Sequence, residues 1–108
     1  MDFLINSQIW HLAVVPPTFP SLLTSSGTFT LGCCDSNTMT IYIADGLSDT
    51  TFKKVLCHEL THAAMFSYDV KLTLDQEELL ADIISTYGNE IVYITNKVFR
   101  KIRYNKGY

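Results

Sequence analysis

The chain has no apolar run long enough to cross a membrane, and its first residues include no Lys or Arg that could begin a signal peptide. The apolar segment from Ile9 to Val15 is interrupted by His11 and is followed directly by two prolines. We therefore expect a cytoplasmic protein that has no membrane partner.

Positive charge is also scarce. The sequence has 8 Lys and Arg residues against 11 Asp and Glu residues, a net charge of -3, and no basic cluster precedes residues 100–106. A dedicated nucleic-acid surface needs such a cluster, so no nucleic-acid partner is expected. We attribute the basic residues at 100–106 to the C-terminal end of a helix, where the helix dipole favours cations.

Cysteine is rare and odd in number. Three cysteines without an export signal are expected to stay reduced. Adjacent Cys33 and Cys34 could pair only through a strained vicinal disulfide. Cys57 has the small apolar character of a packing residue.

The residues that are present indicate a single globular domain over residues 1–108. A chain with 47% hydrophobic and 18% charged residues can bury one core, and no repeat or low-complexity tract divides it. Alternating and β-branched residues predict strands, which we place at 3–5, 9–15, 28–33 and 38–44. An irregular connection over 16–26 separates the second strand from the third, and the last two strands are expected to form a hairpin.

A helix is predicted from about Asp49 to Tyr68, and it carries the sequence His58-Glu59-Leu60-Thr61-His62. Residues four apart lie on one face of a helix, so both imidazoles can approach one metal ion. Glu59 lies about 100° further round and can reach a metal-bound water as a general base. Because the pentapeptide also arises by chance, a third ligand is needed before it predicts a site.

The third ligand is expected on a second helix, which begins near Thr73 or Asp75. Glu78 and Asp82 are four residues apart on one face of this helix. Acidic residues in a first turn can simply complement the helix dipole. Asp82 does not fit that explanation, because it stands among Leu and Ile residues, where an unpaired carboxylate would be costly.

This pattern resembles the gluzincin zinc metallopeptidases, in which H-E-x-x-H is followed by E-x-x-x-D on a second helix. The likeness is closest to the minigluzincins and to the ImmA/IrrE-like peptidases of phages and mobile elements, and it covers roughly residues 38–89. It implies a small zincin-like α+β fold, with a sheet of three to four strands packed on the catalytic helix and the ligand-bearing helix after it. It further implies zinc as cofactor, with His58, His62 and Glu78 as ligands, Glu59 as base, and Asp82 as acceptor of a hydrogen bond from His58.

The sequence departs from the larger gluzincins in two ways. Glu77 stands where they usually have Asn, and their large C-terminal domain, with its transition-state histidine, has no counterpart here. The resemblance therefore does not identify the residue that donates a hydrogen bond to the developing oxyanion. Tyr68, just past the catalytic helix, is the first choice, and Tyr42 and His11 are the alternatives.

Two functions follow from this resemblance. The first is hydrolysis of a peptide or protein substrate, which we expect to pair in extended form with an open edge of the strand at 38–44. The second is a catalytically silent zinc-binding regulatory module of a phage or mobile element, closed by Cys33 or Cys34 as a fourth ligand. Glu59 favours the enzyme, because a structural zinc site needs no general base.

The last third of the chain predicts a long helix, which Gly88 is placed to bend or split. Its apolar residues recur at intervals of four and three and form a stripe that points nearly opposite to Glu78 and Asp82. The stripe consists of Leu80, Ile84, Tyr87, Ile91, Ile94, Val98 and Ile102. Its cover is expected to be either the segment around Phe19, Leu22 and Leu23 or a second copy of the chain in a homodimer.

Overall fold

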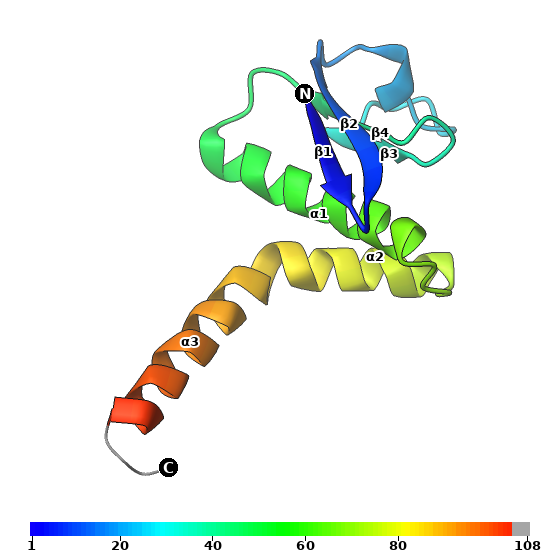
Figure 1. The fold of residues 1–108 in the computed structure, drawn as a ribbon. Coiled ribbons are helices and arrows are strands. Elements are labelled where there is room, and N and C mark those ends of the chain that lie inside the picture. The colour runs from blue at the N-terminus through cyan, green and yellow to red at the C-terminus, as the bar shows by residue number, and fades with distance from the viewer. Residues whose placement is uncertain (105–108) are drawn as a thin grey trace.

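The computed structural model describes residues 1–104, so the end of the basic segment, residues 105 and 106, lies outside the described residues. A four-stranded sheet lies on one side of a long helix, and a second helical run crosses the other side and then projects away from the domain (Figure 1). This confirms the predicted small α+β domain. The elements are β1 (Asp2–Ile5), β2 (Gln8–Val15), η1 (Pro20–Leu22), β3 (Gly32–Asp35), β4 (Thr40–Ala44), α1 (Asp49–Ser67), α2 (Leu74–Ile83), η2 (Ile84–Gly88) and α3 (Asn89–Tyr104).

The sheet is mixed, with the strand order β1-β2-β4-β3. β1 and β2 form an antiparallel hairpin, and its two-residue turn has positive φ at Asn6 and Ser7, as hairpin turns of this length prefer. β4 then pairs parallel with β2 and antiparallel with β3. The predicted pairing of the last two strands is confirmed, but β3 begins at Gly32 because Thr30 instead bonds back to Leu22.

The prediction of an open edge on the strand at 38–44 is wrong. β4 has a hydrogen-bonded neighbour on both sides, so it lies inside the sheet. Its composition explains this position, because Ile41 and Ile43 are fully buried on one face and Tyr42 packs into a second cluster on the other. In the described part of the chain, β3 is the edge strand nearest to α1.

Two apolar clusters lie on the two faces of the sheet. Between the sheet and α1, the buried residues are Trp10, Ile41, Ile43 and Ala63. On the opposite face, Leu22 of η1 packs with Val15 and Ala44, and Phe19 lies against this cluster. The N-terminal segment therefore covers the far face of the sheet, and the prediction that it could cover the C-terminal helix is wrong.

Helix α1 is fixed at both ends. Ser48 caps its N-terminus by accepting a hydrogen bond from the Thr51 backbone N–H. At the other end, the Trp10 indole Nε1–H donates to Ser67 Oγ over 2.7 Å in the core, and Asn6 Nδ2 donates to the Ser67 carbonyl. These contacts fix the rotation of α1 about its axis, and with it the direction in which its histidines point.

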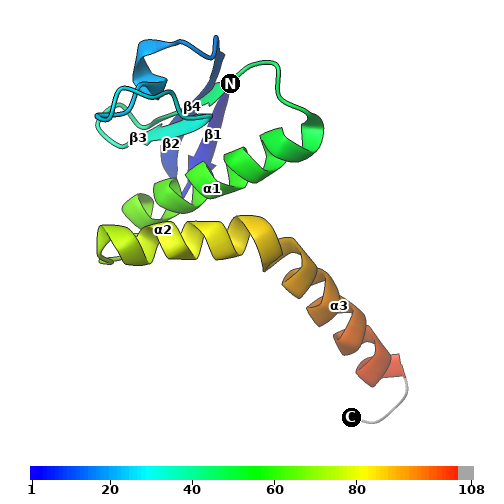
Figure 2. The same ribbon diagram turned by 180° about the vertical axis from the view of Figure 1, so that it is seen from behind.

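Helix α2 begins with a complete capping box between Thr73 and Gln76 and continues through the π-helical turn η2 into α3 (Figure 2). The helical run bends near this turn, where Gly88 was expected to bend it. No residue of α3 is buried. None of the helices in residues 1–104 has the length and apolar character that a membrane span requires.

Candidate metal centre

The two histidines of α1 meet as their spacing predicts. His58 Nε2 and His62 Nε2 lie 3.3 Å apart, and both side chains are mostly buried between α1 and α2. One helical turn separates them, so their rings converge without any distortion of the helix. Two ring nitrogens of this kind are ligands of the type that zinc prefers.

Glu78 of α2 completes the cluster. Its Oε1 lies 2.8 Å from His62 Nε2, and its Oε2 lies 3.4 Å from His58 Nε2. In residues 1–104 these three side chains form a group whose ligand atoms all lie within 4.8 Å of one another. Two imidazole nitrogens and a carboxylate facing one point fit a cation, and three protein ligands leave a fourth position open.

A carboxylate stands behind each imidazole. His58 Nδ1 lies 3.1 Å from Asp82 Oδ1, and His62 Nδ1 lies 3.4 Å from Glu77 Oε2. A carboxylate at Nδ1 favours the tautomer that carries its proton there, which leaves Nε2 free to bind a metal. In both rings, the Nε2 atom is thus the one left to bind a metal.

Asp82 is not buried among apolar side chains, contrary to what its sequence neighbours had predicted. The carboxylate lies beside His58 as expected, yet its side chain is 69% exposed. Its neighbours Leu79 and Ile83 are exposed as well, so they do not remove water from it. The position of Glu77 beside His62 was not predicted from the sequence. Its position in the sequence could have indicated this contact. Glu77 directly precedes Glu78 and lies about 100° from it on the helix, near enough for both side chains to face α1.

Glu59 is the charged residue most withdrawn from water in the described chain, with 8% of its surface exposed. Burial raises the pKa of its carboxyl from 4.5 to about 7, while His58 lowers this pKa and the nearby Glu78 raises it. It faces β3 at a glycine. A Cβ atom on Gly32 would lie 3.0 Å from Glu59 Cγ and 3.1 Å from Oε2. The sheet edge therefore approaches the Glu59 carboxylate closely because residue 32 has no side chain.

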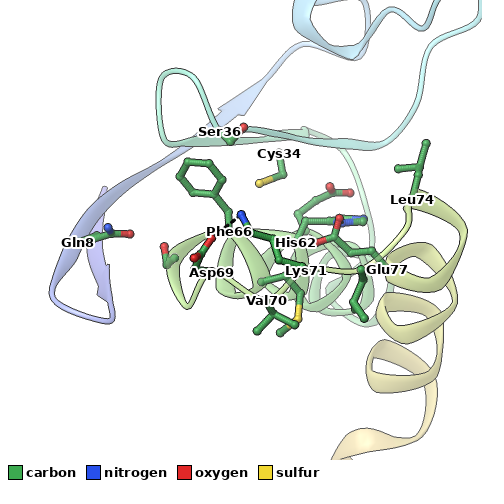
Figure 3. A pocket seen from close by; sticks show the side chains of 14 residues that line it. Gln8, Cys34, Ser36, His62, Phe66, Asp69, Val70, Lys71, Leu74 and Glu77 are labelled. Atoms are coloured by element: carbon green, nitrogen blue, oxygen red, sulfur yellow. Dashed lines mark ion pairs between the residues drawn. The ribbon is translucent and has the colours of Figure 1, made fainter.

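A cleft opens on both sides of Glu59. The larger hollow, about 700 Å³, lies beside His62; Figure 3 shows Cys34 and Ser36 on one wall and Leu74 and Glu77 of α2 on another. The smaller hollow, about 390 Å³, lies beside His58 and is lined by the segment 30–32 and the first turns of α1. Because Glu59 lines both, the cleft runs along the edge of β3 and past the histidine cluster.

The three candidates for an oxyanion donor lie away from this cleft. Tyr68 caps α1, is 58% exposed and lines neither hollow. Tyr42 stacks on Phe19 on the far face of the sheet, and His11 pairs with Asp2 over 2.6 Å. The role suggested for Tyr68 stays a prediction, without geometric support from the described residues.

In residues 1–104, no cysteine joins His58, His62 and Glu78 as a fourth ligand. All three cysteines are free, and Cys33 packs on the sheet face opposite to α1. Cys34 lines the larger hollow, but in residues 1–104 it is not part of the group that could hold a metal. In the metal-free protein, burial and the negative charge of Glu59 raise the pKa of the Cys34 thiol to about 12, so the thiol is protonated at neutral pH.

No curated protein and no solved structure shows significant similarity to this chain. A family model does match it: the IrrE N-terminal-like domain, over residues 22–104. The matched region contains the histidine helix, Glu78, both supporting carboxylates and the edge strand β3. This confirms the predicted likeness to the ImmA/IrrE-like peptidases. The chain therefore belongs to the IrrE N-terminal-like domain family of peptidases.

Proposed function

We propose that this protein is a zinc-dependent peptidase that hydrolyses peptide bonds with Glu59 as its general base. One observation carries the proposal: a buried carboxylate stands between a three-ligand cluster and the edge of a sheet. A purely structural zinc site needs neither a base nor an open coordination position.

His58, His62 and Glu78 are the residues that would hold the metal. A zinc ion bound there supplies Lewis acidity toward a water molecule and toward the scissile carbonyl. Asp82 and Glu77 keep the two imidazoles in the tautomer and orientation that binding requires.

Glu59 accepts the proton of the attacking water and delivers it to the leaving amine. A base that must also act as an acid works best when its pKa lies near the operating pH. Without a metal, burial raises the pKa of Glu59 to about 7, and the positive charge of a bound zinc ion would lower this pKa and so favour the proton-accepting carboxylate. Burial also keeps bulk water from screening the carboxylate.

The substrate is an extended peptide segment held by the main chain of β3. The Ala44 N–H donates to the Leu31 carbonyl, so in the alternating antiparallel ladder Cys33 and Asp35 also face β4. Gly32 and Cys34 then direct their main-chain N–H and C=O groups outward, beside Glu59. Such groups bind any peptide sequence in register.

Side-chain preference comes from the larger hollow. Apolar side chains from the end of α1 and the following turn, among them Met65, Phe66, Val70 and Leu72, line it together with Leu74. We therefore propose cleavage near apolar residues of flexible segments. The alternative of a silent zinc module has no comparable observation in its favour.

The test combines metal analysis with a peptide-library digest read by mass spectrometry. Wild-type protein should contain one zinc per chain and cleave peptides, Glu59→Gln should keep zinc and lose cleavage, and Glu78→Ala should lose zinc. Asp75→Ala is the control, since Asp75 lies in the first turn of α2 outside the cluster. Zinc-loaded wild-type protein that cleaves no peptide, or a Glu59→Gln variant that cleaves normally, would contradict the proposal.

A further inference from the structure

The C-terminal helix α3 has an apolar face that nothing in the described chain covers. Its side chains Ile91, Ile94, Val98 and Ile102 line an open groove along the helix. Figures 1 and 2 show α3 leading away from the sheet and from α1, and in residues 1–104 its main packing is against η2. An isolated helix of 16 residues is marginally stable in water, so a cover for this face is expected.

The apolar positions of α3 follow the spacing of a coiled-coil seam. Ile91, Ile94 and Val98 are separated by three and four residues, and Tyr87 of the preceding turn η2 stands four residues before Ile91. This pattern presents alternate positions of a heptad along one narrow stripe, the arrangement by which two helices pack knobs into holes. A narrow seam of this kind fits a second helix.

The charged residues beside the seam indicate which helix packs against it. Glu90 and Lys97 are seven residues apart, so both lie on the same flank of the stripe, while Val92 and Phe99 lie on the opposite flank. In a parallel pair of identical helices, each flank meets the opposite flank of the other copy, and Glu90 finds no cation. In an antiparallel pair, like flanks meet, so the Glu90 of each copy faces the Lys97 of the other, and the flanks that carry Phe99 also meet.

We propose that α3 is a homodimer interface, in which the helices of two copies pair antiparallel about a twofold axis near Ile91 and Ile94. The seam, the apolar flank and the charged flank are each complementary to themselves under that axis. The interface lies outside the cleft, so it does not depend on the proposed peptidase activity. A basic amphipathic helix can also lie on an anionic membrane, but the acidic Glu90 beside the seam favours a second protein helix.

The first test is sedimentation of the full chain over a concentration series that reaches the millimolar range. A reversible dimer is expected, and Ile94→Asp should raise its Kd by at least about a hundredfold. The matched control is Tyr93→Asp, an exposed aromatic on the opposite side of α3, which should leave Kd within about threefold of wild type. A chain that stays monomeric throughout the series overturns the proposal.

The second test fixes the orientation. Glu90→Lys and Lys97→Glu should each raise the dimer Kd by about tenfold, because two attractive contacts become repulsive. The double variant should restore it to within about threefold, and Arg100→Glu, on the far side of the helix, should have little effect. Failure of the double variant to restore the dimer overturns the antiparallel pairing. Vesicles of phosphatidylserine and phosphatidylcholine form the third arm, and monomers that bind them in place of dimerising would assign this face to a membrane.

Discussion

Each imidazole of the cluster touches two carboxylates, one at Nε2 and one at Nδ1. Glu78 serves the Nε2 atoms of both rings, whereas Asp82 and Glu77 each serve a single Nδ1. The two supporting carboxylates differ in their access to water, with 69% of the Asp82 side chain and 25% of the Glu77 side chain exposed. Water can therefore replace Asp82 more easily than it can replace Glu77.

This difference predicts unequal effects on zinc affinity. Loss of a carboxylate behind a ligating histidine typically weakens metal binding by about 10–100-fold. Asp82→Ala should fall at the lower end of that range and Glu77→Ala at the upper end, measured by competition with a chromophoric chelator. Asp75→Ala should bind zinc as wild type does, and a Glu77→Ala variant that matches this control would remove Glu77 from the site.

The raised pKa of Glu59 predicts a pH-dependent stability of the metal-free protein. Folding raises this pKa from 4.5 to about 7, so the folded state binds the proton more tightly. The resulting stabilisation is fully present below about pH 4.5 and is lost as the pH rises through 7. The loss amounts to about 3 kcal/mol of unfolding free energy. Urea unfolding with a chelator at pH 5 and pH 8 should show most of this loss in wild type but not in Glu59→Gln, and equal losses in both would contradict it.

Gly32 predicts a cost for even one methyl group. An added Cβ would lie 2.6 Å from Val55 Cγ1 and 3.0 Å from Glu59 Cγ. Gly32→Ala should destabilise the fold by about 1–3 kcal/mol through overpacking and should lower kcat by displacing Glu59. Adding Val55→Ala relieves the closer contact only. The double variant should therefore recover stability without recovering kcat, when both are compared with Val55→Ala alone.

At the scale of single residues, the sequence predicted what depends on spacing within one helix. His58 and His62 converge as helical periodicity requires, and Glu78 joins them from α2, where the likeness to the gluzincins placed the third ligand. The burial of Glu59 against a glycine and the pairing of Glu77 depend on how β3 and α2 pack on α1. Neither is visible in local spacing, because both are set by contacts between residues far apart in the chain.

At the scale of the elements, contacts at the C-terminal end of α1 fix the orientation of this helix about its own axis. The buried Trp10 Nε1–H has Ser67 Oγ as its hydrogen-bond partner. Since the same helix carries both histidines, this contact aligns the cluster with α2. The element is thereby stabilised at the end nearest to His62.

Ser67→Ala should therefore cost about 1–3 kcal/mol of unfolding free energy, because it leaves a buried indole N–H without its partner. Urea unfolding followed by Trp10 fluorescence measures this cost. Ser26→Ala is the matched control, since its hydroxyl bonds only within an exposed loop, and a change below about 0.5 kcal/mol is expected there. Equal effects of the two substitutions would remove the stabilising role of Ser67.

Helix boundaries were predictable because their signals are local. The first helix was expected from about Asp49 to Tyr68 and runs from Asp49 to Ser67, and Thr73 caps the second as one of two expected residues. Strand order was not predictable, because the parallel pairing of β2 with β4 joins segments about 30 residues apart. The edge strand was predicted wrongly because its identity depends on this long-range pairing.

At the scale of the whole molecule, the chain is extended by its last helix. The radius of gyration is 16.7 Å, whereas a compact domain of this length has about 13 Å. The cleft beside Glu59 and α3 thus lie in separate parts of the molecule. The cluster of His58, His62 and Glu78, by contrast, joins α1 to α2 within the compact part.

Because its ligands come from two helices, a bound zinc ion should stabilise the whole fold. At a free zinc concentration one hundred times Kd, the expected gain is about 2.7 kcal/mol of unfolding free energy. Glu59→Gln should show the full gain in thermal unfolding, and Glu78→Ala should show almost none. A wild-type Tm that does not respond to zinc would contradict the ligand assignment.

The edge strand β3 also bears on solubility. A sheet edge with unpaired main-chain groups can recruit the edge of another molecule and begin aggregation. Here the strand is only four residues long and ends at Asp35, whose carboxylate accepts a hydrogen bond from the Asn37 N–H. A short edge that ends at a negative charge is a poor template for pairing with the edge of a second sheet. An uncovered β3 is therefore expected to recruit the sheet edge of another molecule less readily than a long flat edge would.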